Sequence, residues 1–354
     1  MKKTIRIKIC DFDPNNPFSY GLFFLKILKK YYDVQLSENP DYVFSHESTT
    51  TYLKYPNAIR ILYTGENIHP NFNLYDYAIS FDHMDFEDRH FRLPVFQLAV
   101  FYRQCDIENA GDTDFKTMRP FTKDDLAAKE GFCSFVYNNY LADNARGDFF
   151  KKLSAYKQVD SGGNYLNTTG TELTSKLDFD RKRKFAIAFE NSSRSGYTTE
   201  KILTAFAADA IPIYYGDPRI AEVFNPERFI NCADYPDFDA VVARVKEIDE
   251  NDELYLEIMN RPILMPGIDF AKDRENLEVF LRHIFDQPLS EARRRRINPI
   301  RAQIYEENEK HIARYRTITN QIRKILALLY RPFKKIPFFE HFKTILFQKI
   351  YSIK

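Results

Sequence analysis

The chain has 354 residues, with 51 Lys plus Arg against 50 Asp plus Glu, so it has room for two domains, and its balanced charge does not favour a nucleic-acid-binding protein. Its cysteines are scattered, without a C-x-x-C pair or a Cys/His cluster, which argues against a zinc site and favours reduced thiols in a cytosolic protein. The N-terminal residues, MKKTIRIKICDFD, lack a long apolar core and predict a first strand rather than a signal peptide. No apolar run reaches the length that a membrane-spanning helix needs.

Short apolar runs separated by polar loops make up the N-terminal part of the chain. The pattern predicts a buried strand at residues 5–10, a helix at 20–32, and further strands at 42–44, 59–63 and 77–81. This alternation is typical of an α/β domain with a parallel sheet, which we place at residues 1–125. The polar and charged stretch 104–129 is predicted to be the linker to a second domain.

A strand, turn, helix, strand unit lies at the centre of the second domain, which we place at residues 126–290. The unit has a β-favouring run at 185–189, a polar break at 190–196, a helical pattern from Thr198 and a second apolar run at 211–215. Such a unit predicts two parallel strands with the helix packed across them. Other elements predicted in this domain are a strand at 132–137 and helices at 145–156, 238–248 and 253–259.

The start of the central helix carries a charge that does not suit its position. Thr198 is the predicted N-cap, and Glu200 in the first turn suits the helix dipole, but Lys201 beside it places a cation near the positive helix end. A phosphate bound by the free amides, with Lys201 closing on it, would remove the conflict. The alternative is that Lys201 points into solvent. In open α/β sheets ligands bind at the carboxyl ends of strands, where the loop 190–196 must lie.

Three further residues could contribute to such a site. Glu66 follows the strand at 59–63, so it can serve as a general base at the ligand edge of the first sheet or simply be a loop glutamate. Arg146 offers a bidentate phosphate ligand or a surface charge, and Asn191 can shape the turn. Together these residues indicate a cleft for a nucleotide-activated substrate. D-x-D pairs can hold a divalent ion, but in this Asp-rich chain we assign no metal site to those at 11/13, 112/114, 178/180 and 237/239.

The C-terminal segment 291–354 differs in composition from the rest. From Arg314 to Lys354 it has ten Lys or Arg residues and one acidic residue, Glu340, with apolar residues spaced as in amphipathic helices. A basic amphipathic helix is typical of segments that lie on an anionic membrane surface. The alternative is that these helices pack on the protein or on a second subunit.

A series of short motifs stands in order between residues 58 and 230: Tyr63–Asn67, Asn71–Ile79, Phe132–Val136, Phe189–Asn191, Tyr197–Lys201, Ala205–Phe206 and Ile211–Gly216. They resemble the bacterial α1,3/4-fucosyltransferases of glycosyltransferase family 10. This resemblance implies an α/β fold of the GT-B type, with two Rossmann-like domains facing a cleft, the N-terminal one for the acceptor and the C-terminal one for GDP-fucose.

The resemblance also implies roles for individual residues. Glu66 matches the position of the general base, and the positions that bind the donor are matched by Arg146, Asn191, Tyr197, Glu200 and Lys201. No metal cofactor is obligatory, and stimulation by Mn²⁺ or Mg²⁺ is left open. The expected reaction is inverting transfer of L-fucose to a GlcNAc hydroxyl of an N-acetyllactosamine-type acceptor in surface glycan or lipopolysaccharide synthesis.

Several features stay open at this stage. The resemblance does not decide between α1,3 and α1,4 linkage, and a homodimer is left open. The expected location is cytoplasmic, peripheral on the inner face of the cell membrane through the basic tail. The alternatives are a GT-B glycosyltransferase that uses another nucleotide sugar and a non-catalytic, membrane-associated glycan-binding protein.

Overall fold

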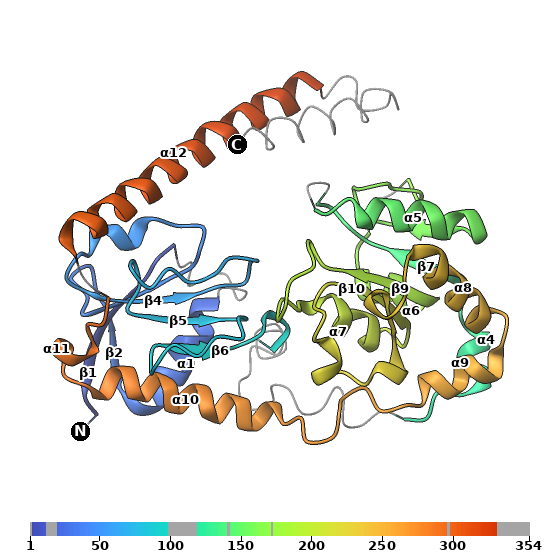
Figure 1. The fold of residues 1–354 in the computed structure, drawn as a ribbon, viewed down its shortest axis with the longest axis horizontal. Coiled ribbons are helices and arrows are strands. Elements are labelled where there is room, and N and C mark those ends of the chain that lie inside the picture. The colour runs from blue at the N-terminus through green and yellow to red at the C-terminus, as the bar shows by residue number, and fades with distance from the viewer. Residues whose placement is uncertain are drawn as a thin grey trace.

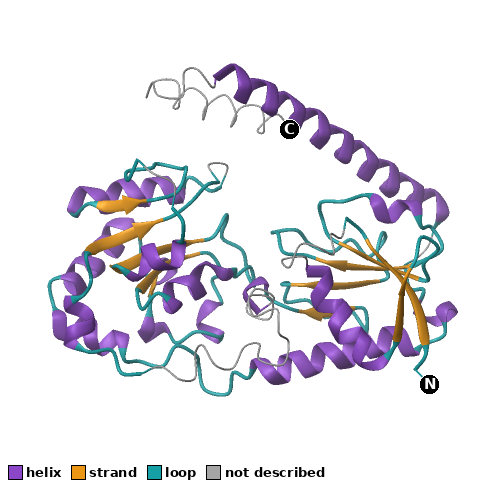
Figure 2. Cartoon of the chain, turned by 180° about the vertical axis from the view of Figure 1, so that it is seen from behind, coloured by secondary structure: helices purple, strands orange, loops and turns teal. Residues whose placement is uncertain are grey.

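Two parallel β-sheets, each flanked by helices, form the centres of two α/β domains in the computed structural model (Figures 1 and 2). The structure describes residues 2–11, 20–97, 119–139, 142–170, 173–295 and 298–330. The α/β class predicted from the sequence is therefore confirmed. The residues 104–118 of the predicted linker and the tail beyond residue 330 lie outside the described residues.

The first sheet has the strand order β2-β1-β3-β4-β5-β6, with every neighbouring pair parallel. Its strands are β1 Thr4–Ile9, β2 Asp33–Leu36, β3 Tyr42–Ser45, β4 Ile59–Tyr63, β5 Tyr77–Ser80 and β6 His90–Arg92. The central strands β3, β4 and β5 are buried along their whole length because helices and loops cover both faces of the sheet. The edge strands β2 and β6 were not predicted, since such short and partly exposed segments have no clear apolar pattern.

The second sheet has the order β11-β10-β9-β7-β8 and is also parallel throughout. Its strands are β7 Gly131–Phe135, β8 Val159–Ser161, β9 Arg183–Phe189, β10 Ile211–Tyr215 and β11 Ile230–Asn231. Helix α7, Glu200–Ala207, packs across β9 and β10 through Ile202, Leu203 and Phe206, which are buried. The predicted strand, turn, helix, strand unit is thus confirmed.

The remaining helices cover the two sheets and connect the domains. They are α1 Tyr20–Tyr31, α4 Lys123–Ala127, α5 Ala145–Tyr156, α6 Lys176–Arg181, α8 Phe238–Asp249, α9 Asp252–Met259, α10 Phe270–Asp286, α11 Leu289–Ala292 and α12 Pro299–Tyr330. Single 3₁₀ turns occur at Thr51–Lys54, Ile220–Glu222, Pro226–Arg228 and Cys232–Asp234.

Helix α10 returns from the second domain to the first and packs on the first sheet (Figure 1). Its Phe285 ring lies 4.3 Å from the ring of Tyr42, measured between centroids, and its Glu278 accepts a hydrogen bond from Lys30 Nζ at 2.6 Å. The predicted limit of the second domain at residue 290 stays a prediction, but the packing places α10 with the N-terminal domain.

The long helix α12 starts on the N-terminal domain and extends across the space between the two domains (Figure 1). Its first turns are attached through Glu306, whose Oε1 accepts a hydrogen bond from the buried guanidinium of Arg60 at 2.9 Å. Farther along, Ile318, Ile322 and Ile325 are exposed. Within the described residues, none of the helices has the length and apolar character needed to cross a membrane.

The segment between α11 and α12 is held by one buried carboxylate of the first sheet, Asp76. Its Oδ1 accepts hydrogen bonds from the backbone amides of Arg294 at 2.8 Å and Arg295 at 2.7 Å, and its Oδ2 accepts one from the amide of Arg60 at 2.8 Å. The Arg295 guanidinium also pairs with Oδ2. Asp76 therefore ties the returning C-terminal chain to the start of β4 and β5.

Replacing Asp76 should destabilise the N-terminal domain strongly. In Asp76→Ala, the amides and the Arg295 guanidinium lose their buried acceptor, and we expect the free energy of unfolding to fall by about 3 kcal/mol. Urea denaturation followed by circular dichroism measures this change. Asp41→Ala removes the partly exposed pair with Arg6 and should leave the transition almost unchanged; similar losses in both variants would contradict the special role of Asp76.

Candidate active site

The loop between β9 and α7 has a different helix cap from the one predicted. Thr199, not Thr198, is the N-cap residue; its backbone is extended, as is usual for an N-cap, but its side chain makes no capping hydrogen bond to the helix amides. The predicted cap at Thr198 is wrong, because its hydroxyl donates instead to Asp217 Oδ2 at 3.1 Å. The tertiary contact with the end of β10 therefore determines where the helix starts.

A buried carboxylate occupies the helix start, where the sequence suggested a phosphate. Glu190 Oε1 accepts a hydrogen bond from the Thr199 amide at 2.7 Å, and Oε2 accepts one from the Thr199 hydroxyl at 2.7 Å. Lys201 Nζ donates to the same Oε2 at 3.0 Å and to Thr199 Oγ1 at 2.9 Å. The protein itself thus supplies the negative charge that stabilises a cation near the helix N-terminus.

The ion pair between Glu190 and Lys201 is largely shielded from solvent. The Glu190 side chain is fully buried and the Lys201 side chain is 17% exposed. Burial raises the pKa of Glu190, while Lys201 and the two hydrogen bonds from Thr199 oppose this effect by favouring the ionised form. Lys201 is consequently held in one position at the edge of the site. Glu190 was not predicted as a functional residue, although it follows the buried run 185–189 and stands inside the motif Phe189–Asn191.

Arg146, on the first turn of α5, is the second cation of the site and is also buried. Its Nη2 donates to the carbonyl oxygen of Phe189 at 2.9 Å and to Asn191 Oδ1 at 3.1 Å, and its guanidinium lies 3.9 Å from the centre of the Tyr137 ring. Its Nη1 donates to the Asn139 carbonyl at 3.3 Å. Among the described residues, no carboxylate forms an ion pair with Arg146, and its Nε has no hydrogen-bond partner. A buried guanidinium in such surroundings favours binding of an anion.

Arg146 and Lys201 are brought together by the last residue of β9, Phe189, and the two residues that follow it. Arg146 contacts Phe189 and Asn191, and Lys201 contacts Glu190 between them. In the sheet order β8-β7-β9-β10-β11, all strands are parallel, but the chain adds β8 on one side of β7 and then β9, β10 and β11 on the other, so the strand order reverses between β7 and β9. This switch point is where open α/β sheets bind ligands, outside the carboxyl ends of the strands. Arg146 therefore lies at the sheet edge where the loop 190–196 was expected, and binding of a ligand there stays a prediction.

The loop 191–198 also forms the junction between the two domains. Ser192 Oγ accepts a hydrogen bond from Asn67 Nδ2 at 2.5 Å, and Arg194 Nη1 donates to His69 Nε2 at 2.7 Å. Gly196 has a φ of +82°, and a Cβ there would lie 2.5 Å from the Phe81 carbonyl oxygen. Any larger residue at position 196 would therefore push the two domains apart.

Asp217 fixes the far side of this loop from the end of β10. Its Oδ1 accepts a hydrogen bond from the Gly196 amide at 2.8 Å, in addition to the bond that its Oδ2 receives from Thr198. Asp217 is buried, and its own amide donates to the Tyr214 hydroxyl oxygen at 2.9 Å. This positioning residue was not predicted, because Gly216-Asp217-Pro218 reads as an ordinary turn in the sequence.

Glu66 lies across the domain junction, just after β4 as predicted. Its amide donates to Thr64 Oγ1 at 3.2 Å, and its side chain lines a pocket. Loss of water around the carboxylate raises the pKa of Glu66, the charge of Glu47 raises it further, and Lys201 lowers it. A raised carboxylate pKa suits a general base, because the group then accepts a proton more readily.

Tyr197, in the loop after β9, and Glu200, the first residue of α7, are the other two predicted donor-binding residues. Tyr197 is buried, and its ring packs edge-on against Phe81 with centroids 5.2 Å apart. Burial raises the pKa of the Tyr197 phenol, with Glu190 and Glu66 adding to the effect. Glu200 is half-buried in the first turn of α7. All six predicted site residues thus surround one junction, although their individual roles stay predictions.

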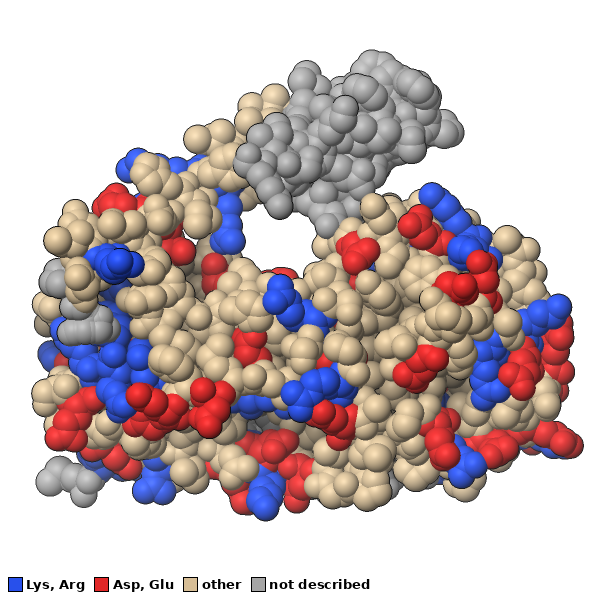
Figure 3. Space-filling view, in the orientation of Figure 1, with Lys and Arg blue, Asp and Glu red and all other residues tan. Residues whose placement is uncertain are grey.

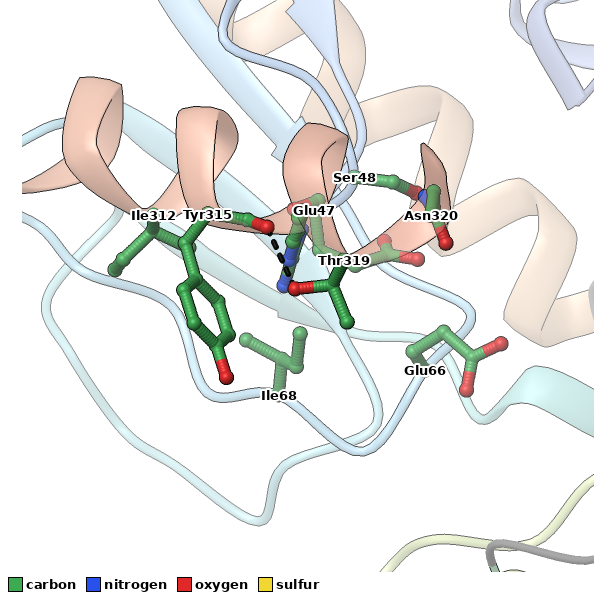
Figure 4. A pocket seen from close by; sticks show the side chains of 9 residues that line it. Glu47, Ser48, Glu66, Ile68, Ile312, Tyr315, Thr319 and Asn320 are labelled. Atoms are coloured by element: carbon green, nitrogen blue, oxygen red, sulfur yellow. Dashed lines mark hydrogen bonds between the residues drawn. The ribbon is translucent and has the colours of Figure 1, made fainter. Parts of the chain in front are cut away.

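A pocket of about 490 Å³ opens beside Glu66, between the first sheet and α12. Its walls come from the ends of β3 and β4, with Glu47, Ser48 and Ile68, and from α12, with Tyr315 and Thr319 among others. Figure 4 shows Tyr315 and Thr319 directed towards Ile68, with Glu66 on the other side of the pocket. The space-filling view in Figure 3 is hollowed between the two domains, on the side that α12 spans.

The aspartate pairs that fall among the described residues cap and pair with neighbouring groups. Asp237 Oδ1 accepts from the Ala240 amide at the start of α8, and Asp239 pairs with Lys152 at 2.5 Å. Asp178 pairs with Arg181, and Asp180 pairs with Lys176. The pair at 112/114 and Asp13 lie outside the described residues. Within the described parts of the chain, no three His, Cys, Asp or Glu side chains gather as metal ligands would.

Two family models match the chain, one in each domain. The model described as "Alpha-(1,3)-fucosyltransferase FucT N-terminal domain" matches residues 7–99, and "Glycosyltransferase family 10 (fucosyltransferase) C-term" matches residues 126–260. An α-(1,3)-fucosyltransferase FucT from Helicobacter pylori is 35% identical over 263 residues, which cover 66% of this chain and 54% of that protein. The chain therefore spans about half the length of this relative.

Solved structures show a similar fold over most of the chain. A crystal structure of an α1,3-fucosyltransferase with GDP is 30% identical, covers 79% of this chain and 91% of its own, and has a TM-score of 0.64. The corresponding structure with GDP-fucose is 29% identical with the same coverage and a TM-score of 0.63. With two parallel sheets in two facing domains, these similarities confirm the expected GT-B fold.

Proposed function

Since the chain belongs to glycosyltransferase family 10, the fucosyltransferases, we propose that it transfers L-fucose from GDP-fucose to a sugar hydroxyl. The observation that carries this proposal is the buried guanidinium of Arg146, which lies at the ligand-binding switch point and pairs with no carboxylate among the described residues. A diphosphate would supply the missing negative charge. The relatives solved with GDP and GDP-fucose support the choice of donor.

The proposed chemistry divides between the two domains. A hydroxyl of the acceptor is a weak nucleophile, and Glu66 takes its proton as the new bond to fucose forms. The leaving diphosphate gains negative charge, which Arg146 and Lys201 stabilise from fixed positions. Attack from the side opposite the leaving group inverts the anomeric centre, so that β-linked GDP-fucose gives an α-fucoside.

Lys201 has to be shared between two partners in this reaction. Its Nζ pairs with the buried carboxylate of Glu190, which neutralises the charge of the lysine. An incoming diphosphate shares Lys201 with Glu190 rather than meeting a free cation. Arg146 needs no such sharing, since its partners are the neutral oxygens of Phe189, Asn191 and Asn139.

The proposed acceptor is the GlcNAc of an N-acetyllactosamine-type unit in a surface glycan such as lipopolysaccharide, fucosylated with α1,3 linkage. The names of the similar enzymes, which include the H. pylori α-(1,3)-fucosyltransferase, support this linkage. Two alternatives predict different products. A GT-B enzyme that uses another nucleotide sugar would transfer a different sugar, and a glycan-binding protein without turnover would transfer none. The simultaneous presence of Glu66, Arg146 and Lys201 argues against the binding protein.

Mass spectrometry of N-acetyllactosamine incubated with GDP-fucose and the purified protein tests the function. We expect the wild-type protein to add one deoxyhexose from GDP-fucose. With UDP- or CMP-sugars as donors, we expect no transfer. Glu66→Gln should lower kcat by roughly 10²- to 10⁴-fold and leave GDP affinity within a few fold. Arg146→Met should instead weaken GDP binding by about 100-fold, because a charged hydrogen-bonding partner is lost.

Arg146→Met is preferred to a Lys201 variant because removal of Lys201 would leave Glu190 buried without its ion-pair partner and endanger folding. Strongly weakened GDP binding in Glu66→Gln would make this residue a donor ligand rather than the base. Transfer from UDP- or CMP-sugars in place of GDP-fucose would overturn the donor assignment.

The pH dependence of kcat/KM should report the environment of Glu66. The base works only when ionised, and its pKa is raised, so the rate should fall with decreasing pH at a value above the ordinary pKa of 4.5. Glu47→Gln removes a negative charge that raises the pKa of Glu66. The acid limb should therefore move to lower pH in this variant, and an unchanged or upward-shifted limb would contradict the coupling between the two carboxylates.

We also propose that the protein is cytoplasmic and peripheral on the inner face of the cell membrane, held by its basic C-terminal segment. The ten Lys or Arg residues from Arg314 to Lys354, and the exposed side chains of Ile318, Ile322 and Ile325, support this location. Removing residues 331–354 should lower binding to vesicles that contain anionic lipids in a sedimentation assay. Equal binding of the shortened and the full-length protein would contradict the proposal.

A further inference from the structure

Helix α12 is fixed against the N-terminal domain between residues 305 and 319. Glu306 pairs with the buried Arg60, and Tyr305 packs on the cluster that contains Tyr52. Arg316 Nη1 donates to the carbonyl oxygen of Glu47 at 3.3 Å, and Thr319, one turn farther, is buried. These contacts hold the helix in register up to residue 319 and place one of its faces beside Glu66.

The pocket next to Glu66 combines apolar walls with hydroxyl-binding groups. Ile68 from the loop after β4, and Ile312 and Tyr315 from α12, supply apolar surface, and Tyr315 remains 51% exposed. Asn320 adds an amide at the α12 side. The volume of the pocket, about 490 Å³, is within the range of binding sites for small ligands. Such a mixture suits a sugar ring, which has C–H faces and a rim of hydroxyl groups.

One polar atom of the pocket lacks a partner. Glu47 Oε2 is buried, and among the described residues no donor forms a hydrogen bond with it. A buried carboxylate oxygen is costly to leave unpaired, so the site favours a ligand that brings a hydrogen-bond donor. With Glu47 and Glu66 against the single Arg316 on its walls, the pocket is also unsuited to an anionic ligand.

We propose that α12 completes an acceptor subsite, in which Tyr315 and Asn320 bind a neutral oligosaccharide whose hydroxyl donates to Glu47 while another hydroxyl is presented to Glu66. This inference rests on the proposed fucosyltransferase function and goes beyond it by assigning acceptor recognition to the C-terminal helix. Tyr315 and Asn320 determine acceptor affinity and do not touch the donor, because Lys201 and Arg146 lie in the other domain.

Isothermal titration of N-acetyllactosamine into the full-length protein, in the presence of GDP, tests the subsite without requiring turnover. Tyr315→Ala should raise the Kd for the disaccharide about tenfold, and Asn320→Ala should raise it severalfold, with the Kd for GDP unchanged. Ile318→Ala is the matched control, since Ile318 is 56% exposed on the same helix and does not line the pocket. Its Kd for both ligands should equal that of wild type.

The same three variants assayed for transfer separate the two proposals. If the inference holds, Tyr315→Ala raises the KM for N-acetyllactosamine and leaves the KM for GDP-fucose unchanged. Equal disaccharide binding by wild type and Tyr315→Ala, an equal loss in Ile318→Ala, or tighter binding of a sialylated acceptor would each overturn the subsite. Absence of disaccharide binding in wild type would overturn it too. Disaccharide binding without any transfer of fucose would overturn the proposed function alone.

Discussion

The buried carboxylate of Glu190 is the constraint on which the site depends. It takes the position at the start of α7 that a helix dipole reserves for an anion, and it holds Lys201 through a hydrogen-bonded ion pair. Gly216 is required beside it, because a Cβ there would lie 2.5 Å from Glu190 Cγ. The same carboxylate accepts a hydrogen bond from the Thr199 hydroxyl. A single group therefore determines the helix start, the position of Lys201 and the shape of the turn.

The two cations near β9 are prepared for an anion in different ways. Lys201 is neutralised by Glu190, whereas Arg146 is surrounded by carbonyl, amide and aromatic groups that leave its charge uncompensated. The difference suits a reaction in which a diphosphate binds and later leaves with added charge. In the proposed reaction, a guanidinium that pairs with no carboxylate among the described residues would attract the donor, and a lysine shared with a carboxylate would limit how tightly the product is retained.

Residues from the end of the chain complete the N-terminal domain. Helix α10 packs on the first sheet, Asp76 binds the chain that follows α11, and α12 forms one wall of the pocket beside Glu66. The domain proposed to bind the acceptor is therefore built from segments about 200 residues apart in the sequence. This arrangement places the C-terminal helix beside Glu66, the residue proposed as the base.

The sequence by itself determined the local elements and the ends of strands at which ligands bind. Strands β4 and β10 and helix α5 were predicted with their observed bounds, because their apolar periodicity reflects burial against a sheet, and Glu66 was placed after β4 for the same reason. Only the tertiary structure decided that Glu190 pairs with Lys201, that Arg146 meets Asn191, and that α12 lies beside Glu66. These contacts join residues far apart in the chain or separated by a turn, and no periodic pattern records such pairings.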